Sequence, residues 1–159
     1  MKKRVAFVMI FIIMMTFCLE AYATINLNST VKYIQKNVNK RSYDGVLDWP
    51  ILALSSMDKN VSSLIRKREQ QIKKGELFTI DRSTDYHRSI ISAVAAGKDP
   101  KKFGGYNLVD DVKKSQLSNG KFGDSISKGG EFLVNAHVWG IISLYVAGEE
   151  IPNRAKALK

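Results

Sequence analysis

The chain has 159 residues and carries 25 lysines and arginines against 15 aspartates and glutamates, so its formal charge at pH 7 is +10. Its single cysteine, Cys18, lies near the N-terminus, which leaves the rest of the chain without a disulfide framework or a thiolate metal site. The charge favours anionic partners, but the densest basic run, residues 65–74, has no interleaved aromatic residues. We therefore expect no nucleic-acid binding, and we interpret that run as the solvated face of a helix.

The N-terminus has the layout of a signal peptide. After MKKR, residues 5–19 carry no charge, and Ala21-Tyr22-Ala23 matches the small-x-small pattern that signal peptidase cuts. These 15 apolar residues are fewer than the roughly 20 that span a bilayer. We expect residues 1–23 to be removed, leaving a secreted, extracellular domain of residues 24–159; a retained membrane anchor is the alternative. Without Lys2, Lys3, Arg4 and Glu20 the counts become 22 basic and 14 acidic, a formal charge of +8.

The remaining chain reads as helices separated by short loops. Hydrophobic periodicity predicts helices over about residues 31–38, 49–57, 61–73, 83–96, 108–117 and 135–147. Residues 28–30 and either Ser83 or Thr84 are expected to cap two of them, and Asp48 and Asp85 are expected to act as caps rather than as catalytic acids. Residues 75–82 are expected to form a loop or a short extended piece.

Three of these helices share a sequence pattern. Ile90-Ile91-Ser92 and Gly97 fall on Ile141-Ile142-Ser143 and Gly148 at an offset of 51 residues. Leu52-Ala53-Leu54 falls on residues 91–93 at an offset of 39. Unequal offsets are typical of a helical array with loops of variable length. The matched serines are expected to allow close helix packing.

The pattern also separates two kinds of helix. The helices near residues 49–57, 83–96 and 135–147 are apolar nearly all round, and the last is expected to be one buried helix. The other three carry a single apolar stripe, so we expect an all-α fold of about three hairpins, each made of an outer and an inner helix. The tail, residues 151–159, reads as the start of a seventh helix. A half-ring of this kind would be covered by further chain, by a second copy or by a ligand.

A short motif carries a family resemblance. Gln116, Gly120 and Phe122 resemble the repeat of squalene cyclases and prenyltransferase beta subunits, the terpenoid cyclase and protein prenyltransferase family. Residues 84–86 and 95–110 resemble the toroid domains of secreted Gram-positive bacterial proteins related to cobalamin carriers. The resemblance implies a partial alpha/alpha toroid over residues 24–159, with ligands held in its lumen or at its mouth. It also implies a structural role for the motif, which ties the end of an outer helix to a neighbouring inner helix.

The catalytic features of that family are missing. Asp110-Asp111 are the only adjacent carboxylates outside the tail and lack the first aspartate of the cyclase motif. The prenyltransferase zinc site needs a cysteine, and the chain after residue 23 has none. We therefore expect no catalytic residues and no metal site, with an enzyme acting on isoprenoid or polysaccharide substrates as the alternative.

Five side chains near the inner-helix ends are the candidate ligand-binding residues. Trp49, Tyr86 and Trp139 could line a lumen and stack a hydrophobic or corrinoid ligand, or could simply be core residues. His87 and His137 could face one mouth of the ring and bind a metal or the cobalt of a cobalamin. Alternatively, they are helix-end histidines bonded to water or to a backbone group.

The loop of residues 119–130 carries four glycines without the sequence context of a phosphate-binding loop, and could be a mobile loop over the lumen mouth. The leading hypothesis is therefore a secreted, non-catalytic binding protein. Its partner would be a small hydrophobic or cobalamin-like ligand, or an anionic cell-wall surface. A truncated remnant of a longer surface protein is a further alternative.

Overall fold

The computed structural model describes residues 27–38 and 47–159, which fall into two separate units. The proposed cleavage site at Ala23, Cys18 and residues 40–45 lie outside the described residues. Within the described ranges every regular element is a helix, and the extended pairings are isolated bridges. The all-α prediction is confirmed.

The first unit contributes one helix, over residues 27–38. Its helical hydrogen bonding already includes residues 28–30, the group expected to cap it. That cap prediction is wrong, because polar side chains resemble a cap in sequence whether they stand before the first turn or inside it.

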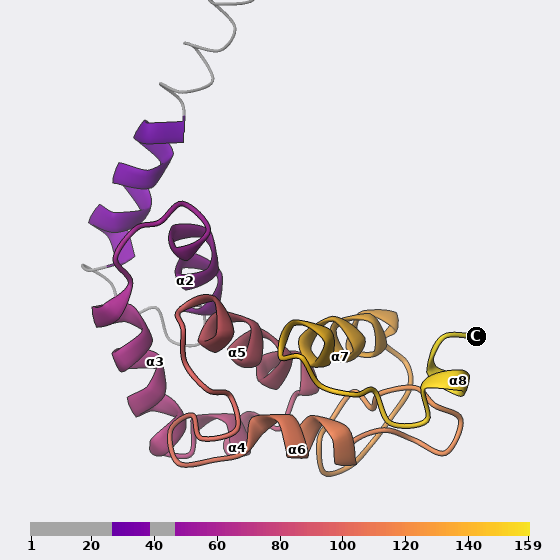
Figure 1. Cartoon of the computed structure of the whole chain (residues 1–159). Helices are drawn as coiled ribbons and strands as arrows, with labels where there is room; N and C mark the ends of the chain where they lie inside the picture. The colour runs from indigo at the N-terminus through magenta and orange to yellow at the C-terminus, as the bar shows by residue number, and fades with distance from the viewer. Residues whose placement is uncertain (1–26, 39–46) are drawn as a thin grey trace, which may run out of the picture. The chain divides into compact units, whose positions relative to one another are not determined.

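In the described part of the second unit, residues 47–159, there are seven helices, labelled in Figure 1. They are α2 (Asp48–Ser55), α3 (Ser62–Lys73), α4 (Glu76–Ile80), α5 (Ser83–Ala95), α6 (Leu108–Lys114), α7 (Val134–Val146) and α8 (Arg154–Ala157). Helix α4 replaces the expected loop or extended piece. One turn is too short for a periodic signal, and its helical form is secured by the complete burial of Leu77.

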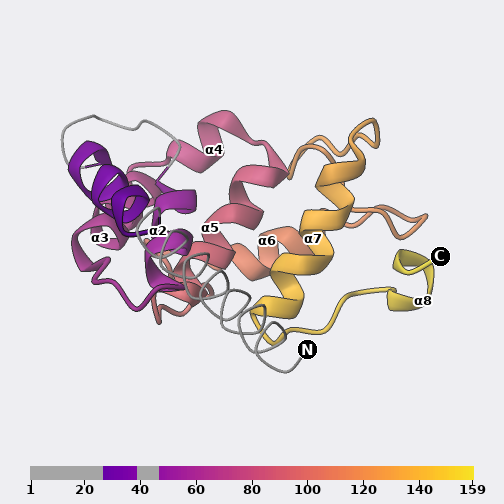
Figure 2. The ribbon, with the colours of Figure 1, turned by 90° about the horizontal axis from the view of Figure 1, so that it is seen from above.

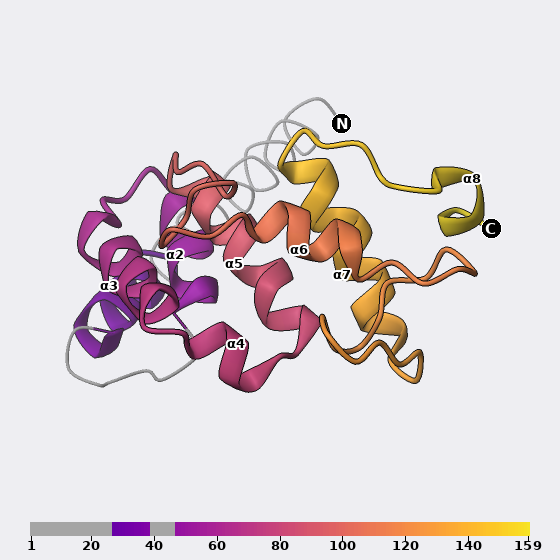
Figure 3. The same cartoon turned by 90° about the horizontal axis from the view of Figure 1, so that it is seen from below.

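Helices α2, α5 and α7 form a row with α5 in the middle (Figures 1 and 2). Helix α6 packs against α5 and α7, and α3 packs against α2 and α4; seen from below, α4 and α6 lie in front of the row (Figure 3). The core lies between these elements and includes Ile51, Leu54, Ile90, Leu108, Val112 and Leu144, all buried. Each such side chain contributes about 1.5–3 kcal/mol when removed from water.

The three helices of the row end in the same geometry. In α5 the amide of Lys98 donates to the Ala93 carbonyl (2.8 Å) and Gly97 donates to Val94 (2.9 Å), the two bonds of a Schellman motif. In α7 the bonds run from Glu149 to Leu144 (2.9 Å) and from Gly148 to Tyr145 (3.0 Å), and in α2 from Lys59 to Leu54 (2.9 Å) and from Asp58 to Ser55 (3.0 Å). Asp58, Gly97 and Gly148 all have positive φ. They are separated by 39 and 51 residues, the offsets of the sequence pattern.

One basic side chain of the run at residues 65–74 is buried. Arg68 of α3 is 1% exposed, its Nε donates to Asp48 Oδ1 (3.1 Å), and its Nη2 donates to Ser89 Oγ (2.9 Å). Ser92 Oγ also donates to Asp48 Oδ1 (2.8 Å). Burial raises the pKa of Asp48, and the charge of Arg68 opposes that rise. The run is therefore not simply a solvated face.

Asp48 and Asp85 are not helix caps. Asp48 is the first residue of α2, and no side chain caps that helix. Asp85 lies in the first turn of α5, again without a side-chain cap, and its carboxylate pairs with Arg82 and Arg88. The expected cap Ser83 uses its hydroxyl on the carbonyl of Gly123 instead. The cap predictions are wrong because Asp48 and Ser83 bond to residues distant in the chain, and Asp85 pairs with neighbouring arginines.

Candidate functional site

Two of the candidate aromatic residues meet on the row. When the three helices are aligned on their Schellman motifs, Trp49 of α2 and Trp139 of α7 occupy the position that Arg88 occupies in α5. The two indole rings contact each other edge to face, with centroids 5.5 Å apart and planes at 64°. Trp49 is 39% exposed and Arg88 is half-buried, so this side of the row is open to solvent. We call Trp49, Arg88 and Trp139, with the exposed Val146 of α7, the inner face.

The structure does not bring Tyr86 to the tryptophans. Tyr86 stands two residues before Arg88, which turns it by about 200° around the helix. Its ring is buried against Phe78 of α4, with centroids 6.2 Å apart. Its edge reaches a surface hollow of about 350 Å³ that Asp81 and Asp111 also line. Burial raises the pKa of Tyr86 to about 12, and the charges of Asp111 and Asp81 add to the effect.

Both histidines contact the ring of one phenylalanine. The ring of Phe122 is 6.5 Å from that of His87 and 6.1 Å from that of His137. His137 Nδ1 accepts from the Phe122 amide (3.3 Å), so the neutral ring carries its proton on Nε2, which donates to the Ala157 carbonyl (3.1 Å). His87 is completely buried, and neither of its ring nitrogens has a hydrogen-bond partner in the structure. Burial lowers the pKa of His87 to about 3.

This geometry limits what the imidazoles can bind. His137 uses both ring nitrogens, and His87 is sealed inside the core, so neither offers a nitrogen to a ligand on the inner face. In the ranges 27–38 and 47–159, no group of three or more histidine, cysteine or acidic side chains is placed to hold a metal ion. The pair therefore makes structural contacts in this fold.

The glutamine-to-aromatic motif fastens the chain after α6. Gln116 Nε2 donates to the Gly120 carbonyl (2.9 Å), and Gln116 forms an isolated bridge with Phe122. Gly120 has φ +92°, and an added Cβ would lie 2.5 Å from Lys156 of α8. Phe122 is buried against Gly140 of α7, where an added Cβ would come within 2.6 Å of the ring. The turn is thus packed on α7 and on the C-terminal segment.

The glycine-rich loop of residues 119–130 makes several hydrogen bonds. Asp124 accepts from the amides of Phe132 (2.8 Å) and Leu133 (3.1 Å), immediately before α7. Asp81, after α4, accepts from the Ser127 hydroxyl (2.7 Å) and amide (3.2 Å). Partial burial would raise the pKa of Asp81, but hydrogen bonds from serines of the loop outweigh it and lower the pKa. Sequence reasoning missed both aspartates, since each bonds to residues that only the fold brings near.

Helix α7 is not the one buried helix that the sequence predicts. It buries Ala136, Gly140, Ser143 and Leu144 and leaves Val134, Val138 and Tyr145 exposed; Tyr145 is 79% exposed. With Ile141, the exposed residues follow i, i+4, i+7 and i+11 spacing along one side of the helix. We call Val134, Val138, Ile141 and Tyr145 the end face.

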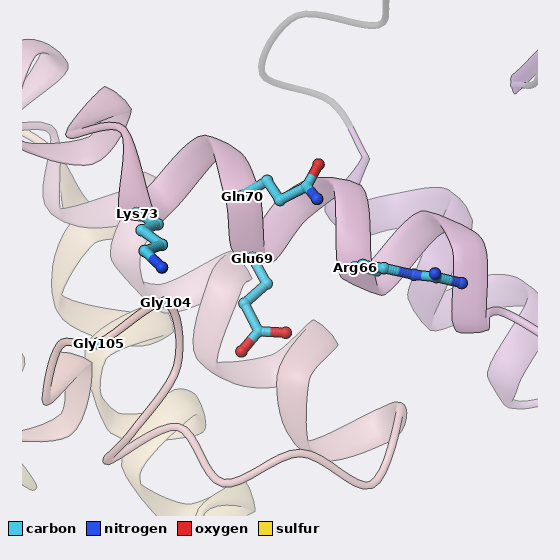
Figure 4. A pocket seen from close by; sticks show the side chains of 6 residues that line it. All are labelled: Arg66, Glu69, Gln70, Lys73, Gly104 and Gly105. Carbon is cyan, nitrogen blue, oxygen red and sulfur yellow. The ribbon is translucent and has the colours of Figure 1, made fainter.

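A polar hollow lies away from these apolar surfaces. It has a volume of about 340 Å³ and lies between α3 and the loop at Gly104-Gly105 (Figure 4). Lys73 points toward Gly104, while Glu69 lies between Lys73 and Arg66. The lining mixes both signs of charge and belongs to the outward side of α3, so it is not part of the inner face.

None of the helices within the described ranges has the length and hydropathy of a membrane-spanning segment. A scan of protein-family models, a search of curated proteins and a search of solved structures found no match to this chain.

Proposed function

We propose that this chain is a secreted, non-catalytic binding protein whose row of helices is part of an alpha/alpha toroid. Its ligand would be a flat, largely apolar molecule held on the inner face, with a cobalamin-like corrinoid as the leading candidate. The resemblance of residues 84–86 and 95–110 to toroid domains related to cobalamin carriers suggested this function, and the tryptophan pair supports it.

The pair carries the proposal for three reasons. Trp49 and Trp139 come from different helices, occupy matched positions and remain partly open to solvent while touching each other. Exposed indole rings lose water readily and stack on flat ligands. Arg88 stands in register between them on α5, where its guanidinium pairs with the carboxylates of Asp85 and Asp48 and so helps to hold α2 and α5 together beneath the aromatic surface.

Intrinsic fluorescence gives a direct test, because these are the two tryptophans of the whole chain. Titration with hydroxocobalamin should quench the emission and saturate, and the apolar dye anilinonaphthalene sulfonate should compete. A signal that never saturates, or that falls only through light absorption by the corrinoid, would overturn the proposal.

Variants then locate the site. Trp139→Leu and Trp49→Leu should each weaken binding in equilibrium dialysis by about tenfold, which corresponds to roughly 1.4 kcal/mol. Tyr86→Phe is the matched control, because the Tyr86 ring lies against Phe78 and not with the pair. Equal losses of affinity in all three variants would show that the tryptophans have only a structural role.

Export is part of the same proposal and rests on residues 1–23. The uncharged run followed by Ala21-Tyr22-Ala23 supports cleavage before Thr24. N-terminal sequencing of protein from the host's culture medium should begin at Thr24. Protein that stays with the membrane fraction and keeps Met1 or Lys2 would contradict it.

The positive charge favours a second partner, an anionic cell-wall polymer bound by the outward side of α3. Arg66, Lys73 and Lys74 are exposed there, beside the polar hollow of Figure 4. Surface charges of this kind are screened within about 10 Å at 0.1 M salt. Co-sedimentation with cell-wall fragments should therefore fall steeply with salt, and retention at 1 M salt would point to a different kind of contact.

A further inference from the structure

The end face of α7 is in register with a buried face of α5. At the offset of 51 residues, Val134, Val138 and Ile141 correspond to Ser83, His87 and Ile90. All three α5 residues are completely buried. Ser83 bonds to Gly123, and His87 faces Phe122, which itself packs on Gly140 of α7. The α5 face is thus covered by α7 and the loop that leads into it.

Helix α7 has the corresponding face without the corresponding cover. Val138 is 44% exposed where His87 is 0% exposed, and Val134 and Tyr145 are exposed still further. No residue from Val134 to Val146 carries a formal charge at neutral pH. A continuous apolar stripe on an otherwise strongly charged protein marks an interaction surface. Its register indicates what the surface accepts: another helix of the same row.

We propose that a second copy of this chain covers the end face, with α7 of one copy packed against α7 of the other. A second copy offers an apolar row helix with an open end face, and that helix is again α7. The contact is therefore isologous, the same patch meeting itself about a two-fold axis. Net charge opposes association, because each molecule carries a formal charge of +8 after loss of residues 1–23, and it opposes association least where the two molecules meet through an uncharged surface such as this one.

The size of the face sets the expected strength. Helix α7 has 13 residues, which at 1.5 Å per residue is about 20 Å of contact length. Such a contact is smaller than the roughly 800 Å² per partner of a standard stable interface. The dimer should therefore be reversible and should form at high micromolar concentration.

Sedimentation velocity of the purified protein from about 10 µM to 1 mM tests the proposal in the range of weak, transient interfaces. The wild type should shift from monomer to dimer. Val138→Glu should raise the dissociation constant at least about tenfold, because the two-fold axis places the new charge twice in one apolar contact. Tyr145→Lys should raise the dissociation constant in the same way, because it places a charge at a second position of the end face. Circular dichroism should be unchanged, since both side chains are exposed.

Ile80→Glu is the matched control. Ile80 is 38% exposed, close to the 44% of Val138, but it lies on α4. It should leave the dissociation constant unchanged. A monomer at every concentration would overturn the proposal and leave the end face to a different protein or a lipid surface. The proposal would also be overturned if the dimer persisted in both α7 variants, or if Ile80→Glu raised the dissociation constant as much as they do. Corrinoid binding is measured separately, so either proposal can fail without the other.

Discussion

Helices α5 and α7 are built from the same pattern and end in the same Schellman geometry, yet only α5 is enclosed. One side of α5 meets α2 and α3, where Arg68 bonds to Asp48 and Ser89. The other side meets α7 and Phe122. Helix α7 has α5 on one side and an exposed apolar stripe along the end face.

The comparison shows that burial here depends on position in the row and not on helix composition. The matched residues His87 and Val138 make the point most sharply. The polar side chain is the buried one, and the apolar side chain is exposed. Neighbours in the fold thus decide which sides of a row helix are covered and which stay exposed. Four predictions test this, from the largest expected effect to the smallest.

The largest effect should come from removing the ion pair that encloses α5 on its α2 side. Arg68→Leu leaves Asp48 buried without its main partner, and breaking a buried pair in this way costs about 3–5 kcal/mol. Urea unfolding followed by circular dichroism measures the loss. Arg66→Leu, an exposed arginine of the same helix, should change stability by less than about 0.5 kcal/mol. A similar loss of stability in both variants would mean that the buried pair of Arg68 and Asp48 does not stabilise the packing around α5.

The next effect tests the contact that encloses α5 on its α7 side. Gly140→Ala would place a Cβ 2.6 Å from the Phe122 ring, and forcing that ring to move should cost about 1–3 kcal/mol. Thermal unfolding gives the change. Combining it with Phe122→Leu should cost less than the sum of the two single changes, because the smaller side chain relieves the clash. Strict additivity would show that the two residues do not press on each other.

His87 should make stability depend on pH. The folded protein disfavours its charged form, with a pKa of about 3, against an ordinary value near 6.5. Below pH 6.5 the unfolded chain takes up a proton that the folded protein refuses. Stability is therefore complete above pH 6.5 and falls by up to about 1.4 kcal/mol per pH unit toward pH 3.

Comparing variants isolates this contribution from that of the acidic groups. His87→Val should flatten the stability curve between pH 6.5 and 4 relative to the wild type. Val138→His, which places the histidine at the matched but exposed position of α7, should add no such slope. A wild type and His87→Val with parallel curves would show that His87 is not sealed from water.

The smallest effect should be the same in both helices. Gly97 and Gly148 have φ +70°, and an added Cβ at either position meets nothing within 4 Å. Gly97→Ala and Gly148→Ala should therefore each cost about 1 kcal/mol, purely through the backbone. Chemical denaturation compares them. A much larger cost in α5 would mean that its enclosed position also strains the end of the helix.

The sequence predicted much of the fold, because its signals are local. Apolar periodicity placed the helices of the row, Gly97 and Gly148 marked two of their ends, and the offsets of 39 and 51 residues reappear in the three Schellman motifs. Helix α4 was missed because a single turn has no periodicity to detect. The caps were misassigned because Asp48 and Ser83 bond to residues 20 and 40 positions away.

The candidate site was only partly predictable. Trp49 and Trp139 meet as matched residues should, whereas Tyr86 is two positions out of register with them and points elsewhere. His87 and His137 both contact Phe122, but one is buried and the other has both ring nitrogens bonded. The amino-acid sequence by itself determined which residues share one side of each helix, since helical geometry alone decides that. The tertiary structure decided what covers each side, burying Arg68 and His87 and exposing the end face of α7, because burial depends on neighbours that are distant in the chain.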